Sequence, residues 1–152
     1  MPRPQKDRIV GQPPVYTEFK PAGVRRKSLD TIILSIDEYE AIRLTDYLNM
    51  EHAQAAEEME ISRPTFTRLI EQARLKLAQF LIEGKYLSIG GGNIHFRGNI
   101  YKCLNCSHVF EADMEKVITH CPICNSDQIT DLASEFGHGN CCRERNDNST
   151  DE

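Results

Sequence analysis

The sequence predicts an α+β protein built from two small parts, and three observations support this fold class. Prolines and short β-branched runs occupy residues 1–36, apolar residues recur at helical spacing over residues 37–89, and two Cys-x-x-Cys pairs lie within residues 99–133. A chain of 152 residues has room for one small domain and a mini-domain, but not for a large two-domain enzyme. The glycine-rich residues 90–98 would link the two parts, and the polar residues 134–152 would form a flexible tail that contains Cys and His.

The first 36 residues are expected to form a basic arm with short strands. Five prolines exclude a mostly helical start, because proline removes a backbone donor and restricts the residue before it. Residues 15–19 and 31–36 are the candidate strands, by their β-branched and aromatic content. Arg3, Lys6 and Arg8 could follow a DNA minor groove, as flexible basic arms do, or could be a solvated chain end.

Residues 37–89 are expected to contain three helices. The first would span residues 37–48 with Asp37 as its cap, the second residues 51–59, and the third would begin after the cap Ser62 and stop at Gly84. The residues expected to face a core are Ala41, Ile42, Leu44, Leu48, Ala55, Ala56, Met59, Phe66, Ile70, Ala73, Leu77 and Leu81. The short turn between the last two helices is typical of a helix-turn-helix.

The outer surface at the start of the third helix carries the groups that DNA-binding helices use. The candidate DNA contacts here are Ser62, Arg63, Thr65, Thr67, Arg68 and Gln72. Arginine can pair with guanine edges, glutamine with adenine, and threonine with a phosphate or the thymine methyl. Residues 63–76 are locally basic although the whole chain has a net charge of −5. A plain three-helix bundle with a solvated surface would show the same pattern, so periodicity alone predicts a fold rather than a function.

Several sequence blocks occur together over roughly residues 1–92: "MPRP", "FKPAG", "DEYEAIRL", "AAEEM", "SRPTF" and "GKYLSIGGG". In combination they resemble a prokaryotic family of predicted DNA-binding proteins, domain-of-unknown-function family 134, which is related to the fourth region of sigma factors. The resemblance implies a helix-turn-helix fold and a DNA-binding role in transcription. Two residues depart from the motif, since Glu60 stands in the turn where glycine is usual and Glu51 begins the second helix where Ser or Thr would cap better. Both departures concern the stability of the fold rather than the outer face of the third helix.

Four cysteines form the pairs Cys103/Cys106 and Cys121/Cys124, separated by fourteen residues. This separation is about one residue short of the spacing usual for such zinc sites. Each pair can direct two thiolates at one ion, as in a small zinc ribbon. Few apolar residues surround the pairs, so the metal would supply the missing folding stability. Iron is the alternative metal, because rubredoxin-like sites use the same four-thiolate cage. A disulfide framework is disfavoured, since thiols stay reduced in the cytoplasm, the expected compartment.

The tail contains a second Cys/His tract, formed by His138, Cys141 and Cys142. It could ligate a second metal, sense an oxidant or pair as a disulfide between chains, and it could equally be two exposed thiols on a solvated tail.

The sequence favours a binding protein over an enzyme. It contains no phosphate loop, no Gly-x-Ser-x-Gly and no carboxylate pair beyond helix surface charge. It also lacks a long apolar run and a secretion signal, so we expect a cytoplasmic protein that does not use a membrane. The leading hypothesis is a DNA-binding transcriptional regulator with a structural zinc site; an iron–thiolate electron carrier and an interaction adaptor without DNA are the alternatives. The expected partners are double-stranded DNA, a protein bound through the ribbon and, for a palindromic target, a second copy of the chain.

Overall fold

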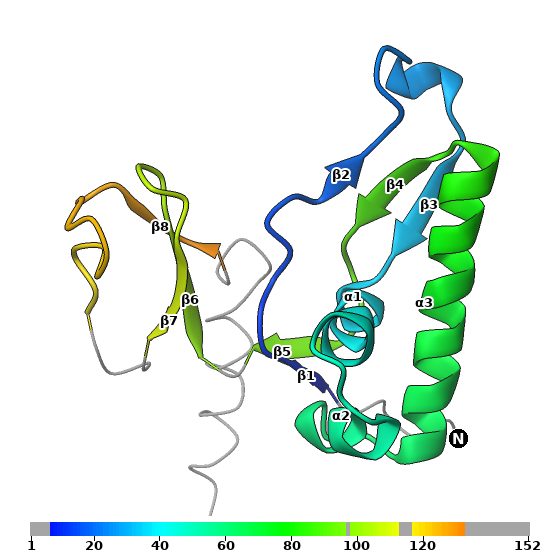
Figure 1. The fold of residues 1–152 in the computed structure, drawn as a ribbon, viewed down its shortest axis with the longest axis horizontal. Helices are drawn as coiled ribbons and strands as arrows, with labels where there is room; N and C mark the ends of the chain where they lie inside the picture. The colour runs from blue at the N-terminus through cyan, green and yellow to red at the C-terminus, as the bar shows by residue number, and fades with distance from the viewer. Residues whose placement is uncertain (1–6, 97, 113–116, 133–152) are drawn as a thin grey trace, which may run out of the picture. The chain divides into compact units, whose positions relative to one another are not determined.

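The computed structural model describes residues 7–96, 98–112 and 117–132, and it confirms an α+β protein with three α-helices and several strands (Figure 1). The chain divides into two compact units. Unit 1 contains the described residues 7–10 and 14–94, and unit 2 contains residues 11–13 together with the described residues from His95 onward. Among the helices of the described residues, none combines the length and the apolar character needed to cross a lipid bilayer.

Unit 1 combines a small sheet with three helices. Its strands are β1 (Arg8–Val10), β2 (Glu18–Phe19), β3 (Thr31–Leu34) and β4 (Tyr86–Ile89), and its α-helices are α1 (Ile36–Ile42), α2 (His52–Glu58) and α3 (Arg63–Glu83). A 3₁₀ turn spans Arg26–Ser28, and a π-helical turn, Arg43–Tyr47, continues α1.

The sheet of unit 1 has the order β2-β4-β3. Strand β4 pairs antiparallel with β2 and parallel with β3, where Ile32 faces Leu87 in register. Alternate residues of β3, Ile32 and Leu34, are buried, as expected of a strand with one face against helices. Two parallel strands must be joined by a crossover connection, and here all three α-helices form the connection from β3 to β4. Helix α3 runs alongside the sheet in Figure 1.

Helix α1 begins one residue earlier than expected, with a different cap. Ser35 is the N-cap: its Oγ accepts from the backbone N–H of Glu38 at 3.4 Å, and the Glu38 carboxylate accepts from the Ser35 N–H at 3.0 Å. The prediction that Asp37 caps this helix was wrong, because Ser35 and Glu38 already form a capping box. Asp37 is instead buried and forms an ion pair with Arg8. The expected core residue Leu48 is 44% exposed, since the π-helical turn has ended before it.

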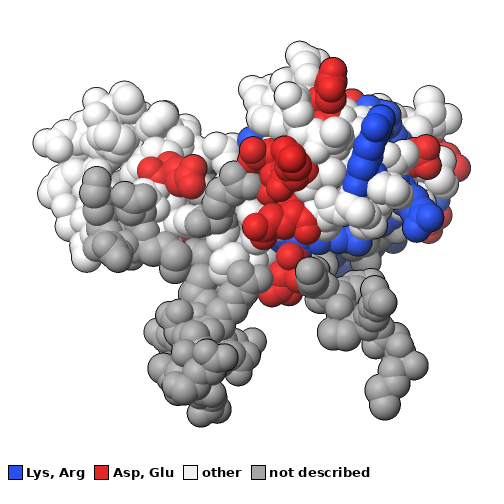
Figure 2. Space-filling view, turned by 90° about the horizontal axis from the view of Figure 1, so that it is seen from below, with Lys and Arg blue, Asp and Glu red and all other residues white. Residues whose placement is uncertain are grey.

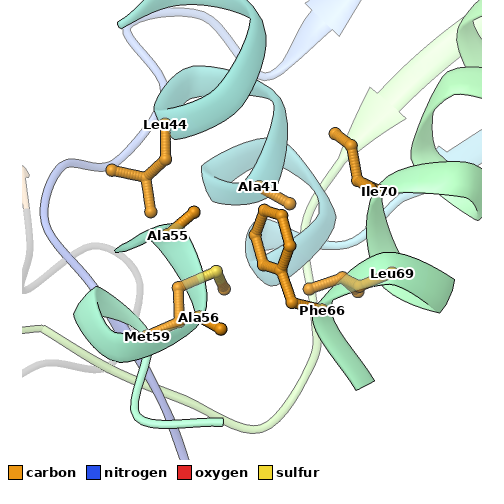
Figure 3. Close-up of a cluster of buried hydrophobic side chains, with 8 residues drawn as sticks. All are labelled: Ala41, Leu44, Ala55, Ala56, Met59, Phe66, Leu69 and Ile70. Carbon is orange, nitrogen blue, oxygen red and sulfur yellow. The ribbon is translucent and has the colours of Figure 1, made fainter. Parts of the chain in front are cut away.

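The helices of unit 1 enclose an apolar cluster, drawn in Figure 3. Its members are Ala41, Leu44, Ala55, Ala56, Met59, Phe66, Leu69 and Ile70. The side chains converge from all three helices, and the small alanines allow the helices to approach closely. The members from α3, which are Phe66, Leu69 and Ile70, all belong to its first half. Leu81 is 73% exposed, which corrects the prediction that it faces the core.

The turn between α2 and α3 is tight, and both ends of α3 are capped as expected. Glu60 has a φ of 55°, in the left-handed region where glycine is favoured. Ser62 caps α3, because its Oγ accepts from the Thr65 N–H at 3.3 Å, and Gly84 ends the helix with a φ of 65°. Ile61 packs against the apolar cluster and donates its N–H to the Ala56 carbonyl at 3.0 Å.

Unit 2 is built around a small antiparallel sheet of order β7-β6-β8. Its strands are β6 (Asn99–Cys103), β7 (Val109–Ala112) and β8 (Ile129–Asp131). Strand β5 (Ile94–Phe96) lies within residues 90–98, the segment expected to be only a linker. Tyr101 and Phe110 pair across β6 and β7 and stack with their ring centroids 5.7 Å apart.

Candidate metal centre and candidate nucleic-acid interface

Unit 2 brings the four predicted metal ligands into one cage. The Sγ atoms of Cys103, Cys106, Cys121 and Cys124 all lie within 4.8 Å of one another, and no disulfide joins them. Two of the Sγ–Sγ separations are 3.5 Å, from Cys103 to Cys124, and 3.6 Å, from Cys106 to Cys121. A tetrahedral ion with metal–sulfur distances of about 2.3 Å would place its ligands about 3.8 Å apart. The cage therefore has the size needed to hold a metal ion.

Both cysteine pairs adopt the same backbone turn. Four backbone N–H···O hydrogen bonds define the two turns: Cys103 to His108 at 2.9 Å, Ser107 to Cys103 at 3.0 Å, Cys121 to Ser126 at 2.9 Å and Asn125 to Cys121 at 3.0 Å. The residue after the second cysteine of each pair, Ser107 or Asn125, has a positive φ of 65° or 60°. Two segments far apart in sequence thus present their sulfur atoms in matching fashion.

Hydrogen-bond donors also point at the sulfur atoms. The Cys106 N–H donates to Cys103 Sγ at 3.4 Å, the Ile123 N–H to Cys121 Sγ at 3.4 Å, and the Asn105 side-chain amide to Cys124 Sγ at 3.6 Å. The Ser126 backbone N–H, helped by the Asn105 amide, lowers the pKa of Cys124 to about 6. The His108 backbone N–H favours the Cys106 thiolate, but burial and the neighbouring thiols raise the pKa of Cys106 to about 12. Four thiols so close together need a cation before all of them can ionise.

The histidines near the cage are not part of it. His108 stacks on Phe110 with ring centroids 5.9 Å apart, and His120 Nδ1 lies 2.9 Å from the hydroxyl of the neighbouring Thr119. The second Cys/His tract, with His138, Cys141 and Cys142, lies outside the described residues.

In unit 1, the structure separates the predicted DNA contacts of α3 into two groups. Ser62, Arg63, Arg68 and Gln72 are exposed at the start of the helix. Thr65 and Thr67 are half-buried, and each is already hydrogen-bonded, Thr65 to Ser62 and Thr67 to His52 Nδ1 at 3.3 Å. The two threonines therefore contribute to the local structure, while the longer side chains face outward.

The four cations of α3 also form two groups. Arg74 forms an ion pair with Asp46 at 2.7 Å, and Lys76 forms one with Glu38 at 2.6 Å. Within the part of the chain that the structure describes, Arg63 and Arg68 form no ion pair. Figure 2, seen from the side where α2 and the start of α3 lie in Figure 1, shows Lys and Arg gathered over unit 1 with Asp and Glu beside them.

Of the three basic residues predicted to act in a flexible arm, Arg8 is the described one. It lies in β1, and its guanidinium donates to the buried Asp37 carboxylate. Arg8 also lines a surface hollow of about 370 Å³, together with Thr65, Arg68, Leu69 and Gln72 of α3. Arg8 thus belongs to the folded unit rather than to a loose arm, a position that depends on a contact no local sequence pattern reveals. Arg3 and Lys6 lie outside the described residues.

Comparison with known proteins identifies relatives over most of the chain. A family model described as "Protein of unknown function DUF134" matches residues 1–97. A UPF0251 protein of Chloroherpeton thalassium is 49% identical over 136 residues, which cover 90% of each chain. A UPF0251 protein of Caldicellulosiruptor bescii is 40% identical over 143 residues, 94% of this chain and 96% of the relative, so the alignment extends through the segment with the four cysteines. No solved structure matches the chain.

Proposed function

Since the chain belongs to the DUF134 family, whose function is unknown, we propose a function from its own geometry: sequence-specific binding of double-stranded DNA by unit 1, in the service of transcriptional regulation. In this proposal α2 and α3 form a helix-turn-helix, and the start of α3 enters the major groove. The cysteine cage of unit 2 holds a structural zinc ion.

The observation that carries the DNA-binding proposal is the state of the cations on α3. Arg74 and Lys76, in the second half of the helix, are neutralised by Asp46 and Glu38. Arg63 and Arg68, in its first two turns, are exposed and have no ion-pair partner among the described residues. Unpaired arginines at the start of an exposed helix are available to phosphates and guanine edges.

The packing of α2 against α3 supports the same proposal. Ala55 and Ala56 are buried against α3, and the left-handed Glu60 gives the sharp change of direction between the helices. Arg68 and Gln72 stand one turn apart, so they share a face of α3 and could contact neighbouring groups of the DNA. Arginine binds a phosphate or a guanine edge, and glutamine can pair with adenine.

Selection from genomic DNA tests the DNA-binding proposal. Sheared genomic DNA is incubated with the purified protein at near-physiological salt, and the retained fragments are sequenced. We expect an enriched motif for the native protein and no enrichment for Arg63→Ala/Arg68→Ala. The control variant Arg74→Ala should enrich the same motif as the native protein, because Arg74 is already in an ion pair with Asp46. Loss of enrichment in that variant counts only if its circular dichroism and melting temperature match those of Arg74→Ala. A folded native protein that enriches no motif would contradict the proposal and favour an adaptor role through protein contacts.

The zinc proposal rests on the closed thiolate cage. Four sulfur ligands leave no open coordination position, which is typical of structural rather than catalytic zinc. Metal analysis and the visible absorption spectrum of the purified protein test the proposal together. We expect one zinc per chain and no visible band, because zinc is colourless. A coloured protein with one iron per chain would instead support the rubredoxin-like electron carrier.

A further inference from the structure

The hollow beside the start of α3 is lined mainly by hydrogen-bond donors that come from two separate parts of unit 1. Arg8 belongs to β1, whereas Thr65, Arg68 and Gln72 belong to the first turns of α3. Among the described residues that line it, Leu69 is the apolar one, and it is 8% exposed. Two guanidinium groups, a hydroxyl and an amide are the groups that bind phosphate oxygens in proteins.

Arg8 is held in place by both its backbone and its side chain. The Arg8 N–H donates to the Asn93 carbonyl at 2.9 Å, and the next residue, Ile9, donates to the Met59 carbonyl at 3.1 Å. The second of these bonds ties β1 to the end of α2, next to the turn that leads into α3. The Arg8 side chain, 23% exposed, donates one nitrogen, Nη1, to the buried Asp37 carboxylate. The guanidinium has five N–H donors in total, so others stay available on the side of the hollow.

We propose that this hollow seats one phosphate of the DNA backbone, held between Arg8 and Arg68, with Asp37 as the residue that positions Arg8. The inference rests on the proposed DNA-binding function and deepens it. Arg8 and Arg68 both line the hollow, and its described lining residues include no acidic side chain. A phosphate fixed beside the first turns of α3 would set the register of the helix in the groove, whereas Arg63 stays free for another contact.

The salt dependence of binding to a labelled random-sequence duplex distinguishes a shared phosphate from separate ones. The slope of log K against log [salt] changes by about 0.9 for each phosphate neutralised. If Arg8 and Arg68 hold the same phosphate, Arg8→Ala and Arg68→Ala each weaken binding and keep the native slope. The double variant then loses about 0.9 of slope. Slope losses of about 0.9 in each single variant and about 1.8 in the double variant would mean separate phosphates and overturn the proposal.

Removal of Arg8 leaves the buried Asp37 without its cation, which could destabilise unit 1. The pair Arg8→Gln/Asp37→Asn avoids this, because both charges are removed together, and Asp37→Asn alone keeps the Arg8 charge. We expect Arg8→Gln/Asp37→Asn to bind the duplex as weakly as Arg8→Ala, and Asp37→Asn to bind with the native salt slope. If the double substitution binds as tightly as the native protein while melting normally, Arg8 is only structural and the proposal is wrong.

A second experiment titrates the protein with inorganic phosphate and follows the NMR signals of the Arg8 and Arg68 Nε–H groups. Chloride at equal ionic strength is the control. Saturable shifts with phosphate in a protein that binds no duplex would contradict both the DNA-binding function and the backbone-phosphate proposal, and would assign the hollow to a free phosphate compound. If the native protein binds the duplex, the salt-slope comparison decides the proposal by itself. Absence of both duplex binding and phosphate shifts would likewise overturn it.

Discussion

Glu60, in the turn between α2 and α3, has a backbone conformation that is unfavourable for a residue with a side chain. Its φ of 55° lies in the left-handed region, which costs a residue with a Cβ atom about 1–2 kcal/mol. Glycine avoids this cost but loses more entropy on folding. We expect Glu60→Gly to raise the free energy of unfolding by about 0.5–1 kcal/mol in a urea titration. Glu57→Gly, in the right-handed backbone of α2, is the matched control and should lower the free energy of unfolding by about 1 kcal/mol. A loss of stability in both variants would show that Glu60 makes a compensating contact.

Gly92 is a second residue at which a single methyl group should matter. Its φ is 96°, and a Cβ atom there would lie 2.8 Å from Asp37 Oδ1, on the carboxylate that holds Arg8. We expect Gly92→Ala to lower the free energy of unfolding by about 2 kcal/mol, because two costs add up. The alanine strains the backbone at this positive φ, and its methyl group displaces the buried Asp37 carboxylate. The matched control is Gly90→Ala, because a Cβ atom at Gly90 meets nothing within 4 Å. Equal urea midpoints for the two variants would show that the 90–92 segment adjusts without cost.

At the level of elements, the π-helical turn after α1 is joined to α3 by the Asp46–Arg74 ion pair. The Arg74 side chain, through its hydrogen bond, holds the pKa of Asp46 below its usual value. A carboxylate with a lowered folded pKa adds stability above its unfolded pKa of about 3.9, and this stability is lost as the pH falls through the folded value. Both side chains are more than 40% exposed, so solvent screens the pair and its contribution is small.

The lowered pKa of Asp46 determines the effect that we expect of Asp46→Asn on stability. The free energy of unfolding should fall by roughly 0.5 kcal/mol at pH 7 and low salt. The difference from the native protein should shrink as the pH falls below about 4, and also in 1 M salt. Urea titrations at several pH values measure both trends, with the exposed Glu57→Gln on α2 as the control. A difference that persists unchanged at acid pH would assign the effect to side-chain packing rather than charge.

Elements encoded by local signals could be predicted, whereas those created by distant pairing could not. The cap Ser62, the stop at Gly84 and the buried Phe66 and Ile70 are all readable from helical spacing and end residues. Strand β4, only four residues long, was missed because it forms by parallel pairing with β3, 55 residues earlier in the chain. The first helix cap was misplaced for a related reason: Asp37 looks like a cap locally, but its partner is Arg8.

The same distinction applies to the candidate sites of the whole molecule. The cysteine cage could be predicted because each Cys-x-x-Cys pair makes its turn from adjacent residues, and the geometry brings all four sulfur atoms together as expected. The surface of α3 could be predicted only in part. Which arginines are neutralised depends on Asp46 and Glu38 in other elements, and the hollow beside Arg68 needs Arg8 from β1. Sequence periodicity carries no information on these long-range ion pairs.

The two units should respond differently to removal of the metal that we propose for the cage. Unit 1 has its own apolar cluster around Phe66, whereas unit 2 has strands of three to five residues and counts Cys103 and Cys121 among its buried side chains. A small sheet with so little apolar burial depends on metal binding for its folding energy. Chelation under reducing conditions should therefore collapse the amide NMR signals of β6, β7 and β8, and leave those of α1, α2 and α3 dispersed.

Variants sharpen this test, because they remove the metal without a chelator. Cys103→Ser/Cys121→Ser should lose the metal and reproduce the collapse, while retaining the duplex affinity of unit 1, which holds all the described residues proposed to contact DNA. His120→Ala should keep both the metal and the signals, since this histidine is bonded to Thr119 and lies outside the cage. If the β6–β8 signals stay dispersed in the metal-free serine variant, the sheet folds without an ion. If the helices of unit 1 collapse as well, the units share one folding transition, and the metal stabilises the whole chain.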